Sequence, residues 1–87
     1  MRLNEAAAVF NRLVNDCPEL EGNNFLLMIP EPTLPVISKG YEIIIRKSKS
    51  LDDETDKTLH AIAVEHHLRL METGNTVALY TSTDGIG

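Results

Sequence analysis

Residues 59–71 read LHAIAVEHHLRLM, and the predicted fold depends mainly on them. Its apolar residues fit a helix that is apolar around most of its circumference, with Glu65 and Arg69 placed for an i, i+4 ion pair. The preceding residues 50–56 are rich in acids, which stabilise the positive N-terminal end of a helix. Gly74 can adopt the left-handed conformation that often ends a helix. We therefore predict one long helix that ends at Gly74.

One further helix and two strands are predicted before this stretch. Apolar residues recur at helical spacing over residues 3–17, and Pro18 prevents the helix from continuing. Residues 25–29 form a short, wholly apolar run, which is typical of a strand buried on both faces. Residues 41–46 contain three successive isoleucines with polar neighbours, and alternate side chains of a strand point to opposite faces. We therefore expect the strand at 41–46 to be exposed on one face.

The order of these elements predicts the fold class. Residues 75–81 form a third predicted strand, and residues 82–87 a flexible tail. The resulting order, α-β-β-α-β, predicts a single α+β domain over residues 1–87, in which two helices pack on one side of a small three-stranded mixed sheet. A right-handed crossover through the long helix would make strands 41–46 and 75–81 parallel. The other side of the sheet would be left for water or a partner.

Length and composition indicate one soluble globular domain. The chain has 87 residues, of which 43% are hydrophobic and 24% charged, and these values exclude a disordered or fibrous protein. No apolar run approaches the roughly 18 residues that span a bilayer, and Glu5 interrupts the region where a signal peptide is apolar. The only cysteine, Cys17, cannot form an internal disulfide. We expect a cytoplasmic protein that does not enter a membrane.

Positive charge is confined to one part of an acidic chain. The net charge is −5, whereas residues 39–49 carry four cations and one acid. Arg46, Lys47 and Lys49 lead into the predicted N-terminus of the long helix, where backbone N–H groups can bind an anion. The alternative is a solvated connection whose lysines balance the acids that follow. Nucleic-acid binding is not expected, because so few cations surrounded by acids cannot neutralise a row of phosphates.

The histidines are the most reactive side chains on the predicted helix. His60 and His67 would share one helix face but lie two turns apart, too far to chelate one ion, so no metal and no cofactor are expected. These two residues could sense protons or bind a ligand at an interface. The alternative is that they are structural residues hydrogen-bonded to their neighbours. Cys17 is expected to be an ordinary packed cysteine, since it belongs to the apolar stripe of its helix.

These features favour a non-catalytic interaction protein. We expect it to dock on a second copy of itself or on another protein, using an apolar sheet face and the long helix. The alternative is a small enzyme or ligand-binding protein in which His60 or His67 works with Asp56 or Glu65 at a pocket or subunit interface.

Overall fold

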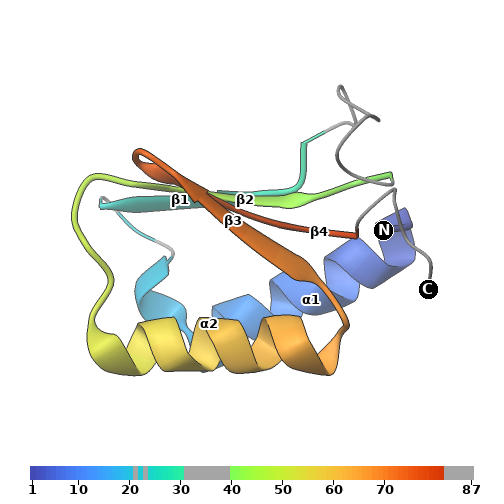
Figure 1. The fold of residues 1–87 in the computed structure, drawn as a ribbon, viewed down its shortest axis with the longest axis horizontal. Coiled ribbons are helices and arrows are strands. Elements are labelled where there is room, and N and C mark those ends of the chain that lie inside the picture. The colour runs from blue at the N-terminus through green and yellow to red at the C-terminus, as the bar shows by residue number, and fades with distance from the viewer. Residues whose placement is uncertain (21, 23, 31–39, 82–87) are drawn as a thin grey trace.

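The structure, a computed structural model, describes residues 1–20, 22, 24–30 and 40–81. Within these residues the chain forms two α-helices and a four-stranded antiparallel sheet, which is an α+β fold as predicted. Both helices lie on the same side of the sheet (Figure 1). The predicted tail at 82–87 lies outside the described residues. The elements are α1 (Leu3–Asp16), the short 3-10 helix η1 (Pro18–Leu20), β1 (Phe25–Met28), β2 (Ile43–Lys47), α2 (Asp53–Glu65), β3 (Arg69–Thr73) and β4 (Thr76–Tyr80).

The first half of the chain follows its sequence pattern closely. The apolar stripe of α1 is buried, with Ala6, Val9 and Leu13 fully covered, and the helix ends before Pro18. β1 and β2 pair in antiparallel register, with Leu27 opposite Ile45. The prediction that residues 25–29 are buried on both faces is wrong. Leu26 is 53% exposed, because the helices cover only one face of the sheet.

The prediction of a helix reaching Gly74 is also wrong, since α2 ends at Glu65. His67 has a left-handed φ of 56° and donates its N–H to Val64, and the N–H of Leu68 returns to the carbonyl of Ala63 at 2.8 Å. These two bonds form a Schellman motif, which satisfies the last carbonyls of a helix. Glycine usually occupies the left-handed position, but histidine is among the residues that tolerate it. Helix termination is therefore encoded here without a glycine.

Gly74 belongs to a hairpin instead of a helix end. β3 and β4 pair from Arg69 opposite Tyr80 to Thr73 opposite Thr76, which leaves a loop of two residues. Gly74 takes a positive φ of 57° at the first loop position, as tight hairpin turns require. The sheet therefore has a fourth strand, β3, where the sequence predicted the last turns of a helix.

This extra strand also corrects the predicted strand directions. The sheet order is β1-β2-β4-β3, and β4 runs antiparallel to both β2 and β3. The helical crossover through α2 thus joins β2 to β3, which point the same way, and β4 is inserted between them. The crossover rule expects parallel strands at the two ends of the helix, and it holds for β2 and β3. The prediction that strands 41–46 and 75–81 are parallel is wrong because the chain reverses once more at Gly74.

The core lies between the helices and the inner face of the sheet. Leu59, Ile62 and Ala63 are the buried residues of α2, and Val64, at 75% exposure, is its one strongly exposed large apolar side chain. Leu68 and Leu70, predicted to lie on the helix, leave it and pack partly against the core. Apart from Val64, the large apolar side chains of α2 are therefore covered within its own chain, and a helix apolar around most of its circumference does not exist here. The sheet contributes six further core residues, namely Phe25, Leu27, Ile43, Ile45, Val77 and Leu79.

Candidate functional site: the open face of the sheet

The face of the sheet turned away from the helices carries a row of apolar side chains. Each lies next in sequence to residues that point into the core: Ile44, for example, stands between the fully buried Ile43 and Ile45. Strand register places Met28 opposite Ile44, Ile44 opposite Ala78, and Ala78 opposite Met71. We call these four residues, Met28, Ile44, Ala78 and Met71, the apolar row. It crosses all four strands and spans three inter-strand spacings, or about 14 Å.

Further side chains flank the apolar row on both sides. Two residues along the strands in one direction, the register aligns four residues on the same face, which are Leu26, Arg46, Thr76 and Thr73. In the other direction Arg69 is paired with Tyr80. Glu42, two residues before Ile44, lies on the same face because side chains alternate along a strand. We call the apolar row together with these seven residues, Leu26, Arg46, Thr73, Thr76, Arg69, Tyr80 and Glu42, the open face.

The open face is more exposed than a core and more apolar than an ordinary solvated surface. Met71 is 38% exposed and Leu26 is 53% exposed, whereas the other three members of the apolar row are half-buried. Of the elements that the structure describes, none packs over this face (Figure 1). Sequence reasoning expected an apolar second face but did not identify Met28 and Met71 as part of it. The sequence pattern places Met71 on a helix, and on a helix it could not pair with Ala78.

The two sides of the molecule differ in charge. Over residues 3–20 and 52–65, which form the helix layer, eight acids outnumber two cations. The open face instead carries two arginines and one glutamate. A chain with a net charge of −5 thus presents a locally positive surface on its sheet. The acids of the helix layer are Glu5, Asp16, Glu19, Asp52, Asp53, Glu54, Asp56 and Glu65, and its cations are Arg12 and Lys57.

The three predicted anion-binding residues do not converge on one point. Arg46 belongs to the open face, while Lys47 points to the opposite face and lies 3.3 Å from Glu72. Lys49 lies 5.8 Å from the ring centroid of Phe25, within reach of a cation–π contact. A shallow hollow between β1 and β2 is lined by Asn24, Arg46, Lys47 and Ser48 among others. Anion binding by this stretch stays a prediction.

His60 and His67 are likewise not brought together. His60 lies on the exposed side of α2, where its Nδ1 is 2.8 Å from the carbonyl oxygen of Asp56 and can donate to it. His67 follows the helix and forms its left-handed cap. The predicted shared helix face is wrong, because the helix ends before His67. Their proposed roles in proton sensing or ligand binding stay predictions.

The histidine with the most specific partner is His66, which the sequence did not single out. Its Nε2 lies 3.3 Å from Arg12 Nη1. A guanidinium can only donate, so the ring nitrogen is the acceptor in this contact. Arg12 also pairs with Glu65 and with Asp16, and the pKa of Glu65 is lowered mainly by the hydrogen bond from Arg12. This cluster joins α1 to the end of α2 and stabilises the contact between them.

Cys17 is buried in the core and is not activated. Burial raises the pKa of its thiol, and the nearby charges of Asp16 and Glu19 raise it further. A nucleophilic cysteine needs the opposite shift, which stabilises the thiolate. The structure therefore confirms that Cys17 is packed, and it gives the thiol no local group that would favour attack on a substrate.

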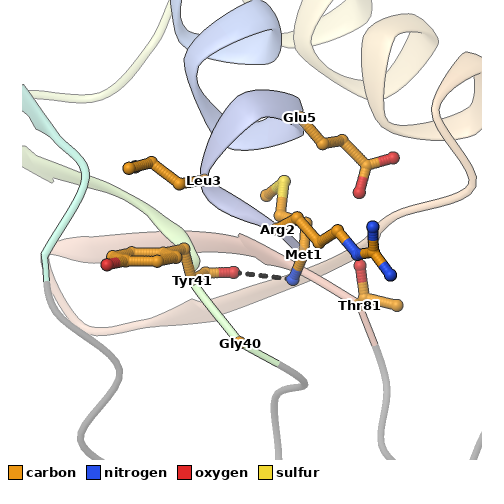
Figure 2. A pocket seen from close by; sticks show the side chains of 7 residues that line it. All are labelled: Met1, Arg2, Leu3, Glu5, Gly40, Tyr41 and Thr81. Carbon is orange, nitrogen blue, oxygen red and sulfur yellow. Dashed lines mark hydrogen bonds between the residues drawn. The ribbon is translucent and has the colours of Figure 1, made fainter.

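A hollow of about 570 Å³ lies beside the N-terminus (Figure 2). Met1 donates its amino group to the Tyr41 carbonyl at 2.9 Å and accepts the Tyr41 N–H at 2.7 Å, so the first residue is joined to the sheet. The lining is mostly apolar, and its charged side chains, Arg2 and Glu5, are both exposed. Among the described residues that line it there is no histidine, cysteine or nucleophile paired with a base, so we assign it no chemistry. Its residues are Met1, Arg2, Leu3, Glu5, Gly40, Tyr41 and Thr81.

Two further features are absent from the described residues. No group of three or more histidine, cysteine, aspartate or glutamate side chains there could hold a metal ion. No described helix has the length and hydropathy needed to cross a membrane.

Comparisons with protein-family models, with curated proteins and with solved structures each gave no match to this chain. A functional proposal must therefore rest on the arrangement of the residues themselves.

Proposed function

We propose that the chain is a non-catalytic interaction protein that docks on another protein molecule through its open face. The observation that carries this proposal is the apolar row, in register across four strands on the face opposite the helices. An apolar centre with a polar rim is the usual anatomy of a protein interface, and methionine, tyrosine and arginine are enriched there. The proposal covers two kinds of partner, a second copy of the chain and a different protein.

The size of the open face indicates how stable the complex would be. The apolar row extends about 14 Å across the strands, and the flanking residues extend the face by about 14 Å along them. A patch of these dimensions is smaller than the roughly 800 Å² that each partner buries in a standard interface. We therefore propose a reversible interaction instead of a permanent assembly.

The position of Ile44 on β2 supports the same function. A soluble monomer has no structural need for an isoleucine at position 44, since its neighbours Ile43 and Ile45 already supply the core contacts of this strand. Apolar side chains that gather in one patch on a protein surface promote association. Threonine would serve a strand equally well and would be better solvated.

A selection experiment tests the proposal without assuming the partner. Displayed random peptides of about 16 residues, long enough for four helical turns, are selected against the folded chain. The recovered binders are then measured against Ile44→Glu, which places a charge in the apolar row, and against Val64→Glu. The second variant is a matched control, since Val64 is an exposed apolar residue on α2.

We expect most binders to lose affinity for Ile44→Glu and to keep it for Val64→Glu. Light scattering on the chain alone covers the case of a second copy, where Ile44→Glu should dissociate a dimer. The proposal would be contradicted if the binders kept their affinity for Ile44→Glu and the chain alone stayed monomeric.

A further inference from the structure

We infer that the occupant of the open face is an amphipathic helix of a different protein, with acidic residues on both sides of its apolar stripe. This inference rests on the proposed function and names the partner's chemistry. Three observations carry it: the open face offers side chains and no strand edge, its charge is positive, and its arginines stand on opposite sides of the apolar row.

The occupant must satisfy its own backbone hydrogen bonds. An extended peptide laid on the open face would leave N–H and C=O groups against apolar side chains such as Ile44 and Met71, and unpaired polar groups are costly to bury. A helix pairs these groups internally.

The charges disfavour a second copy as the occupant. Two open faces packed against each other would bring four arginines and two glutamates into one small interface, and like charges brought together weaken binding. The acidic helix layer of a second copy offers no matching apolar stripe. Its strongly exposed large apolar residues, Leu3 and Val64, lie on different helices. A head-to-tail contact of this kind would also lead to an open chain of molecules unless the rotation closed.

The spacing of the arginines fits a helix lying along the apolar row. Arg46 is two residues from Ile44 on one side, and Arg69 is two residues from Met71 on the other. Two residues of a strand span about 7 Å, and a helix with its side chains has a radius of about 5–6 Å. Each arginine would therefore stand beside such a helix, and the row itself would face about ten helical residues. Acids on both flanks of the helix would meet them, and the attraction would be stronger on the Arg46 side because Glu42 lies on the same side of the row as Arg69.

The test uses two synthetic peptides of about 16 residues that share one leucine stripe at helical spacing. The first has glutamates on both sides of the stripe, and the second has lysines at the same positions. Each is titrated into isotope-labelled protein, and the shifts of the backbone amide signals give both the affinity and the location. Carbon shifts of the labelled peptide report whether it is helical when bound.

We expect the glutamate peptide to bind as a helix and to shift signals on the open face, with an affinity about tenfold above that of the lysine peptide. The double variant Arg46→Glu, Arg69→Glu should reverse this preference, since it exchanges attraction for repulsion. Thermal unfolding of the variant shows whether its fold is kept. Raising the salt from about 50 mM to about 500 mM should reduce the difference between the peptides.

The outcomes separate this inference from the proposed function. Equal binding of the two peptides at the open face, or binding in an extended form, would overturn the inference and leave docking intact. A dimer that Ile44→Glu dissociates would do the same. Absence of binding by both peptides, by selected ligands and by a second copy would overturn both.

Discussion

The two faces of the sheet are built from alternate residues of the same strands, and they use the same side chain for different purposes. Ile43 and Ile45 are fully buried against the helices, while Ile44 between them faces away and is only half-buried. Burial of a large aliphatic side chain stabilises a fold by roughly 2 kcal/mol, and one left on the surface contributes far less. β2 therefore carries one isoleucine beyond the two that fill the core, and that isoleucine lies on the open face.

The largest expected effect compares adjacent isoleucines. Ile45→Ala removes a fully buried side chain and should lower the free energy of unfolding by about 2–5 kcal/mol, because it leaves a cavity. Ile44→Ala makes the same chemical change on the open face and should cost about 1 kcal/mol or less. Urea denaturation of both variants measures the difference. Equal losses would mean that the open face belongs to the folding core and would end the distinction drawn between the two faces.

A second comparison sets a crowded glycine against an uncrowded one. Gly40 has a φ of 78°, and a Cβ there would lie 2.5 Å from the carbonyl oxygen of Met1. Gly74 has a φ of 57°, and a Cβ there would meet no atom within 4 Å. Gly74→Ala should cost about 1 kcal/mol for the left-handed backbone, and Gly40→Ala about 2 kcal/mol or more because the contact with Met1 must also move. The denaturation midpoints of the two variants give the order, and a reversed order would contradict the pairing of Met1 with Tyr41.

A smaller effect is expected at the end of α2. His67→Gly should stabilise the fold by roughly 0.5–1 kcal/mol, since glycine adopts the left-handed φ of the Schellman motif with less strain. The thermal midpoint should rise by a few degrees. Because His67 lies outside the open face, peptide binding should not change. A fall in stability would show that a contact of the His67 side chain stabilises the fold by more than its left-handed backbone destabilises it.

The smallest expected effect is the loss of folding stability at low pH, which arises from carboxylates of the helix layer. Hydrogen bonding by Arg12 lowers the pKa of Glu65 below its ordinary 4.5, and the N–H of Thr55 lowers the pKa of Asp52 below its ordinary 3.8. A carboxylate whose pKa is lowered by folding stabilises the fold above its ordinary pKa, and this stabilisation is lost as pH falls through the lowered value. Both side chains are exposed, so the loss should be modest.

Glu65→Gln provides the measurement of that effect. The variant should be less stable than the parent at neutral pH, and the two denaturation midpoints should converge as the pH falls below 4.5. Arg12→Gln should show the same convergence, because the guanidinium is the main cause of the lowered pKa. A difference that persists unchanged to low pH would mean that the carboxylate charge contributes nothing.

Prediction from the sequence succeeded where one pattern dominated and failed where two overlapped. The stripe of α1 and the isoleucines of β2 fit one periodicity each, so those elements were placed correctly. Residues 66–73 fit a helix and a strand equally well, because Leu68 and Leu70 can satisfy either period. The pair Gly74-Asn75 was the available signal, since it is a common two-residue hairpin loop.

The open face was harder to predict than the fold. Its existence followed from two helices sharing one side of the sheet, and the alternation around Ile44 was visible in the sequence. The apolar row depends on the register of three strand pairs, which brings Met28 and Met71 into line with Ile44. Register is fixed by tertiary pairing and turn geometry, so no local pattern could reveal it.

The three methionines allow one measurement to test docking at the open face most directly. Met28 and Met71 belong to the apolar row, while Met1 is 4% exposed and lies in the core as an internal control. A sample labelled with ¹³C at the methionine methyl groups gives one NMR signal for each, and a ligand obtained by the selection described above is added. We predict that the Met28 and Met71 signals shift together while Met1 stays in place. A ligand that binds without moving Met28 or Met71 would contradict the account.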